Sequence, residues 1–122
     1  MTVSKHWVGV HGTKIQTVQW EDGDGNPVGG SADFYHGNED SHGWPFVESF
    51  RFQEGVISKG VNGLMIEDLI QVLIDRLNYF QKSQFSSDFN AEAVQHLGRA
   101  YDSLMKRRYD RERRGVLGKH EA

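Results

Sequence analysis

The sequence predicts an α+β protein, with a small antiparallel β-sheet in residues 1–55 and an α-helical hairpin in residues 56–122. Two observations lead to this fold class. In the first part, short stretches alternate between apolar and polar residues and are separated by glycine-rich turns, which is typical of antiparallel strands. In the second part, apolar residues recur every three or four positions over two long stretches, which is typical of amphipathic helices.

Three stretches of the first part have strand patterns. Residues 7–10 are mostly apolar, and Lys14–Trp20 alternates in the way that a half-buried strand does. Residues 21–30 are so rich in glycine, aspartate and proline that they predict a loop. The clearest strand is Phe46–Gln53, and the carboxylate of Glu48 on its otherwise aromatic side indicates a position at the edge of the sheet or at an interface.

One cluster in the first loop has the residue types of a calcium site. Asp22, Asp24 and Asn26 have the spacing of the first three ligands of a calcium-binding loop. Pro27 stands where such a loop requires glycine, and no helices flank it. The pattern therefore favours an ordinary turn over a calcium site.

Residues 31–45 predict a second loop, which contains His36 and His42 among small polar residues. With no third ligand at a suitable spacing, two exposed loop histidines are favoured over a metal site. The chain has no cysteine, so it has no disulfide, no thiolate metal site and no thiol nucleophile.

Residues 66–80 predict an amphipathic helix, and the acidic Glu67 and Asp68 in its first turn suit the positive end of the helix dipole. Its apolar face is wider than one partner helix requires, which indicates burial on two sides, against the sheet or another subunit. A second helix follows. Its pattern predicts an N-cap at Asn90 and an end at Gly115, after a basic last turn.

The last helix also carries a stripe of arginines. Arg107, Arg111 and Arg114 are four and three positions apart, so they lie on one side of a helix. Ala93 and Ala100 precede them on the same stripe and would let another element approach closely. Aligned guanidinium groups suit phosphate oxygens because they donate paired, planar hydrogen bonds. The alternative is a solvated basic helix end that complements its own dipole.

Length and charge limit the function. A chain of 122 residues is one domain, or one domain with a small appendage. No apolar run is long enough to cross a bilayer, and no signal-peptide pattern is present, so we expect a soluble intracellular protein without a membrane partner. Residues 1–90 carry six Lys/Arg against twelve Asp/Glu, net −6, while residues 91–122 carry eight against five, net +3. This distribution suits a small anionic ligand better than duplex nucleic acid.

From Phe52 onward the sequence resembles a known family. It is similar to the Thoeris anti-defence type one proteins, phage-encoded sponges that counter bacterial immune signalling and share their helical hairpin with the shorter anti-CBASS sponges. The β-rich front part fits the longer Thoeris type. The blocks that carry the resemblance are FQEG at Phe52, GVNG at Gly60, EDL at Glu67, RLNYFQ at Arg76, Phe85, Asn90-Ala91, and KRRYDRERRGVLGKH at Lys106.

The resemblance implies a protein that captures a cyclic nucleotide messenger, an isomer of cyclic ADP-ribose, between neighbouring subunits and holds it unaltered in the cytoplasm of the infected bacterial host. It also implies a homo-oligomer, from dimer to hexamer, and a possible separate site for cyclic di- or trinucleotides. No cofactor is implied. The positions that match the family's ligand-binding motif are Phe80, Asn90, Arg107, Arg111 and, more weakly, Arg114.

These residue types suit the roles that the resemblance assigns. The ring of Phe80 would stack on adenine, the amide of Asn90 would read a base or ribose edge, and the arginines would neutralise the diphosphate. Core packing would equally account for Phe80, and capping for Asn90.

Two other functions remain as alternatives. An enzyme that degrades the messenger would need a nucleophile, a metal or an acid–base pair in the site. The proposed residues supply none of these, and Asp110 and Glu112 lie off the arginine stripe, so we expect no enzymatic activity. A small nucleic-acid-binding module that uses the basic end of the last helix is the second alternative, and it would bind long polyanions with a steep salt dependence.

Overall fold

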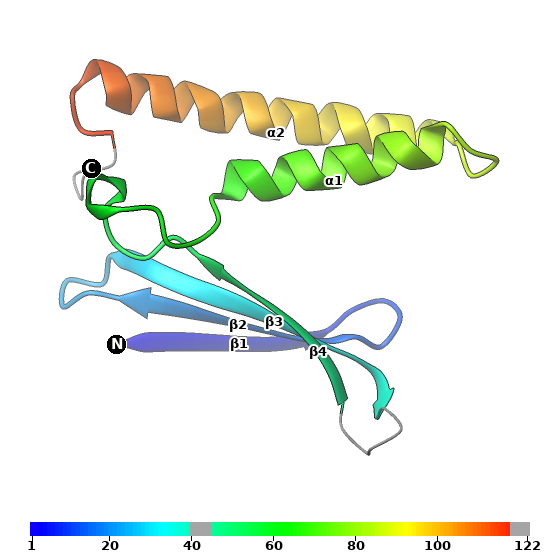
Figure 1. Cartoon of the computed structure of the whole chain (residues 1–122), viewed down its shortest axis with the longest axis horizontal. Helices are drawn as coiled ribbons and strands as arrows, with labels where there is room; N and C mark the ends of the chain where they lie inside the picture. Colours follow the sequence, from blue (N-terminus) through cyan, green and yellow to red (C-terminus); the bar gives the residue numbers. More distant parts are fainter. Residues whose placement is uncertain (40–44, 118–122) are drawn as a thin grey trace. The chain divides into compact units, whose positions relative to one another are not determined.

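The computed structural model describes residues 1–39 and 45–117 (Figure 1). It consists of two compact units, one formed by Met1–Leu64 and one that starts at Met65. The first unit holds a four-stranded antiparallel sheet and the second holds two helices. The predicted α+β fold class is therefore confirmed. Residues 56–64, which the sequence analysis assigned to the hairpin, lie in the same unit as the sheet.

The sheet of the first unit is a simple meander. Each strand pairs with the next along the chain, in the order β1-β2-β3-β4, and all three pairs are antiparallel. β1 and β4 are consequently the two edges, which agrees with the edge position that Glu48 indicated. The strands are β1 (Thr2–Val8), β2 (Lys14–Glu21), β3 (Pro27–Glu39) and β4 (Pro45–Phe52).

β3 extends through residues that the sequence analysis assigned to loops. The turn before it is short, because one carboxylate oxygen of Asp22 accepts hydrogen bonds from the backbone amides of Asp24 (2.9 Å) and Asn26 (3.0 Å). Gly29 and Gly30 lie within the strand. A Cβ atom on Gly29 would lie 2.6 Å from the Trp20 ring, and one on Gly30 would lie 2.6 Å from the Val18 carbonyl oxygen. These glycines allow close cross-strand packing, and the predicted loop over residues 21–30 is wrong beyond residue 26.

The apolar side of the sheet runs across all four strands. Trp7 pairs with Ile15, which in turn pairs with Phe34 on β3. The Phe34 and Phe50 ring centroids are 5.7 Å apart. Ala32, between β2 and β4, is the most deeply buried apolar residue of the described chain, at 4% exposure. This small cluster is the core of the first unit.

The segment after β4 is fastened by side-chain hydrogen bonds to backbone groups. Asn62 accepts from the Glu54 amide at 2.8 Å and donates to the Glu54 carbonyl at 2.9 Å. The Gln53 side chain accepts from the Asn62 amide at 2.9 Å. Leu64 then pairs with the end of β4. These hydrogen bonds therefore join the FQEG block to the GVNG block, and a short 3₁₀ helix, η1 (Ile57–Lys59), lies between the two blocks.

The second unit is an α-helical hairpin. α1 (Ile66–Gln81) starts at the predicted residue, and α2 (Asp88–Arg113) returns alongside it (Figure 1). The turn between them is held by Gln81, whose amide donates to the Ser87 carbonyl and accepts from the Ser87 amide, both at 2.9 Å. Among the described residues, no helix is long and apolar enough to cross a membrane.

α2 starts earlier than the sequence analysis predicted. Its N-cap is Ser87, whose hydroxyl oxygen accepts from the Asn90 backbone amide at 3.0 Å. The predicted N-cap at Asn90 is therefore wrong. Serine caps a helix as well as asparagine does, and the bonds to Gln81 fix the position at which the helix starts.

Candidate ligand-binding site

The loop end of the hairpin holds two of the predicted site residues, Phe80 and Asn90. Phe80 lies half-buried in the last turn of α1. Asn90 lies in the first turn of α2, where its side-chain nitrogen donates to the Phe85 carbonyl at 3.1 Å. No described residue donates to its side-chain oxygen. Asn90 is thus held in one orientation and retains an acceptor for a ligand.

Phe80 has a neighbour that the sequence analysis did not select. The guanidinium carbon of Arg76 lies over the Phe80 ring, 4.8 Å from its centroid. This distance is within the range of cation–π attraction. The spacing of four residues between Arg76 and Phe80 on a helix is the signal that could have indicated this contact.

The other end of α2 is closed by a Schellman motif. The Val116 amide donates to the Arg111 carbonyl at 2.9 Å, and the Gly115 amide donates to the Glu112 carbonyl at 3.0 Å. Gly115 has a φ of 72°, a conformation that favours glycine. The predicted end at Gly115 is confirmed. The Arg111 guanidinium also donates to the Val116 carbonyl at 3.0 Å, so it helps to fix the chain after the helix.

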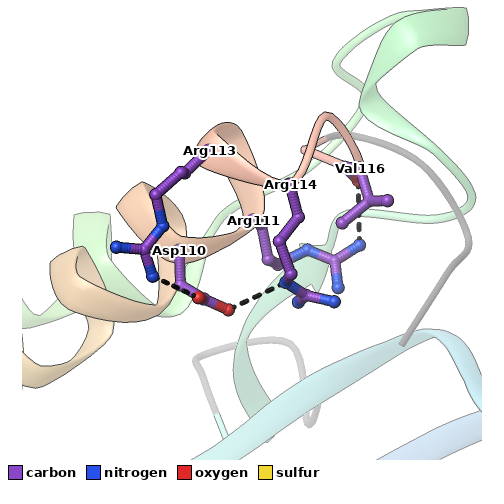
Figure 2. A network of polar contacts seen from close by, with 5 residues as sticks. All are labelled: Asp110, Arg111, Arg113, Arg114 and Val116. Atoms are coloured by element: carbon purple, nitrogen blue, oxygen red, sulfur yellow. Dashed lines mark hydrogen bonds and ion pairs between the residues drawn. The ribbon is translucent and has the colours of Figure 1, made fainter.

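Asp110 forms the centre of an ion-pair cluster at this helix end (Figure 2). Its carboxylate accepts from Arg113 at 2.9 Å and from Arg114 at 3.0 Å. The hydrogen bond from Arg113, together with the charge of Arg114, lowers the pKa of the Asp110 carboxyl. The sequence analysis placed Asp110 off the arginine stripe. It nevertheless reaches Arg114, because four residues along a helix bring two side chains one above the other.

Arg107 differs from the other two arginines of the stripe. Its side chain is exposed, and within residues 1–39 and 45–117 it forms no hydrogen bond or ion pair. Arg111 and Arg114 both contact protein groups. Arg107 is therefore the arginine of the stripe whose donors are most available to an anion.

The two groups of predicted residues lie far apart along the hairpin. Arg107 follows Asn90 by 17 positions on the same helix, which corresponds to about 26 Å at 1.5 Å per residue. Arg111 is one further turn away. A mononucleotide-sized ligand cannot span this distance. One copy of the chain therefore does not bring the loop end and the basic end into one site.

The metal alternatives find no support in the described residues. Asp22 caps a turn, and no group of three potential metal ligands is found in the described part of the chain. His36 does not lie in a loop, as predicted, but in β3, where its Nε2 is 3.2 Å from a carboxylate oxygen of Glu48 on the neighbouring strand. His42 lies outside the described residues.

The fold and these side chains define a small α+β protein whose helical hairpin has an aromatic and amide pair at one end and an arginine cluster at the other. No family model matches the chain. Over 76 residues, 62% of its length, the chain is 49% identical to Thoeris anti-defense 1 of Bacillus phage SBSphiJ7. Neither unit alone is long enough to contain this match.

This similarity supports the Thoeris anti-defense 1 family, which the sequence resembles. The chain spans about half of its relative, because the match covers 54% of that protein. The resemblance that the sequence analysis found is thus confirmed by the comparison.

Proposed function

We propose that this protein is a viral anti-defence protein that acts in the cytoplasm of an infected bacterium. It binds a cyclic ADP-ribose isomer, the messenger of the defence, and sequesters it without degrading it. The observation that carries the proposal is the 49% identity over 76 residues to a phage protein named Thoeris anti-defense 1. The chain spans about half of that relative, so the residues of this chain must also account for the proposed activity.

Side chains near the two ends of α2 supply what such a ligand needs. The Arg107 guanidinium has free donors for the diphosphate, and Arg111 adds a second positive charge one turn away. At the loop end, the side-chain oxygen of Asn90 accepts from a base amino group or a ribose hydroxyl, and the ring of Phe80, in the last turn of α1, stacks on the base.

The separation of the two groups along α2 supports a site between two copies. The loop end of one copy would lie beside the basic end of another, which brings Phe80 and Asn90 to Arg107 and Arg111. The apolar side chains on α1 support such an assembly. In a single copy, Val72 is 62% exposed and Leu73 is 45% exposed, and both become buried if another hairpin packs on this helix. The assembly in the proposal is a homo-oligomer, from dimer to hexamer.

The proposed residues bind without reacting. The arginines neutralise phosphates that are present before and after any hydrolysis, and uniform binding of this kind gives affinity without turnover. Asp110, the carboxylate of the arginine cluster, accepts from Arg113 and Arg114 and has a lowered pKa. A carboxylate in this state is a weak base.

The test is recovery of the ligand. The protein is incubated with a purified cyclic ADP-ribose isomer, freed of unbound ligand, and denatured by heat. The released material should have the original mass and should activate a messenger-dependent effector as well as untreated ligand does. A linear or hydrolysed product that accumulates with time would show an enzyme instead.

The same preparation separates the proposal from a nucleic-acid-binding module. Long single-stranded and double-stranded polyanions should bind weakly, with an affinity that falls steeply with salt. The messenger should bind with much less salt dependence. Cyclic di- and trinucleotides belong in this comparison as further small ligands.

A further inference from the structure

The Arg76 guanidinium occupies a face of the ring that the proposed function assigns to base stacking. Its carbon lies 4.8 Å from the Phe80 centroid. Arg76 and Phe80 are one turn apart on α1, so the contact forms within one helix and does not depend on assembly. A base that approaches this face of the ring meets Arg76 first.

Arg76 has no other partner in the described part of the chain. Its side chain is exposed, and no carboxylate or carbonyl of residues 1–39 and 45–117 accepts a hydrogen bond from it. An exposed arginine usually pairs with an acid or points into water, whereas this one lies on an aromatic ring. All five N–H donors of its guanidinium are therefore free, while the ring restricts the position of the group.

The neighbouring backbone is fixed as well. Gln81, five residues after Arg76, exchanges two hydrogen bonds of 2.9 Å with Ser87. Asn90 donates to the Phe85 carbonyl in the same turn. The base-binding end of the hairpin is consequently ordered before any ligand arrives, and Arg76 supplies a positive charge at this end.

We infer that Arg76 is a further ligand-binding residue, which stacks between Phe80 and the purine base of the messenger and donates to its phosphate or ribose oxygens. This inference rests on the proposed function. A guanidinium is planar and weakly hydrated, so one face packs on a ring while the other accepts a base. Its donors point outward in the plane, toward oxygens at the edge of the base. Phe80 then acts on this face as the positioning residue that holds Arg76.

The experiment measures affinity for a purified cyclic ADP-ribose isomer by calorimetry. Arg76→Ala should weaken binding about 5- to 150-fold, since stacking on a base contributes about 1–3 kcal/mol. Arg76→Lys keeps the charge but loses the plane, and it should bind several-fold more weakly than wild type. Arg99→Ala, which removes an exposed arginine from the middle of α2, is the matched control and should bind as wild type does.

A double-mutant cycle tests the layered arrangement. Phe80→Leu keeps an apolar side chain but removes the ring. When it is combined with Arg76→Ala, the fold-loss of messenger affinity should be smaller than the product of the fold-losses of the two single variants. The melting temperature of each variant should stay near that of wild type, which excludes a merely structural effect. Binding of Arg76→Ala that equals or exceeds that of wild type would overturn the inference alone. Failure of wild type to bind any cyclic ADP-ribose isomer would instead overturn the proposed function.

Discussion

Arg107, Arg111 and Arg114 carry the same charge on one stripe of α2 but have different contacts. Arg107 is exposed and has no partner within the described residues. Arg111 donates to the Val116 carbonyl, and Arg114 pairs with Asp110. The weaker weight that the sequence analysis gave to Arg114 stays a prediction. It now has a physical reason, because a ligand phosphate would have to compete with a carboxylate at 3.0 Å.

Arg107→Ala is expected to reduce messenger affinity about 10- to 150-fold, the effect of losing about 1.5–3 kcal/mol of charge-assisted hydrogen bonding. The melting temperature should not change, because the side chain is exposed and forms no hydrogen bond or ion pair with a described residue. Arg111→Ala should reduce affinity similarly but also lower the melting temperature slightly, since the bond to Val116 is lost. Calorimetry and thermal unfolding measure the two effects.

Arg108→Ala is the control for both variants. It removes an equal charge from the same turn of α2, next to Arg107 but one position off the stripe. An equal loss of affinity in Arg108→Ala would indicate that only net charge matters. Full affinity in Arg107→Ala would mean that the stripe does not contact the ligand.

At the level of the elements, the hairpin turn separates two roles that the sequence analysis combined in one residue. Ser87 caps α2, while Asn90 occupies the first turn with a side-chain acceptor still available. Gln81 ties the end of α1 to Ser87. The turn thus has structural residues and a candidate ligand-binding residue within ten positions of each other.

Ser87→Ala and Asn90→Ala should therefore have opposite effects. Ser87→Ala should lower the free energy of unfolding by about 1 kcal/mol, the usual cost of losing an N-cap, with messenger affinity nearly unchanged. Asn90→Ala should reduce affinity at least several-fold, with a smaller loss of stability because its backbone amide keeps the cap. Denaturant unfolding and calorimetry on both variants measure this. The reverse pattern would restore Asn90 as a purely structural residue.

For the whole molecule, the main feature is how little of a single copy is buried. Gly30 and Ala32 are the two buried residues among those whose burial the structure describes, and no described residue of either long helix is buried. Several large apolar side chains on the hairpin are exposed, including Val72 and Tyr79 at 62% and 69%. Apolar surface on this scale favours association with another copy.

Val72→Glu tests the assembly. In a monomer the change is tolerated, because the side chain is mostly exposed. In an interface it buries a charge without a partner and should dissociate the oligomer. Light scattering at micromolar concentration should give an oligomer for wild type and a smaller species for Val72→Glu, with messenger affinity lost in parallel.

Gln95→Glu, which adds the same charge at an exposed polar position of α2, should leave the assembly unchanged. A monomeric wild-type protein would remove the basis for a site between two copies.

The fold class, the start of α1 at Ile66 and the glycine that stops α2, Gly115, could be predicted from the sequence alone. These features depend on residues within one or two turns of each other, so periodicity and end signals are sufficient. The candidate site residues could also be identified from the sequence, because their spacing matches that of a known family. Their role as ligand contacts stays a prediction.

Features that depend on contacts with other elements could not be predicted in this way. Gly29 and Gly30 look like turn residues in the sequence, yet they lie in β3, where Trp20 and Val18 of the neighbouring strand β2 approach them too closely for a side chain. Ser87 became the N-cap because Gln81 of the other helix holds it. The contact of Arg76 with Phe80 lies within one helix, but helical spacing permits it without requiring it, so it too was found only in the structure.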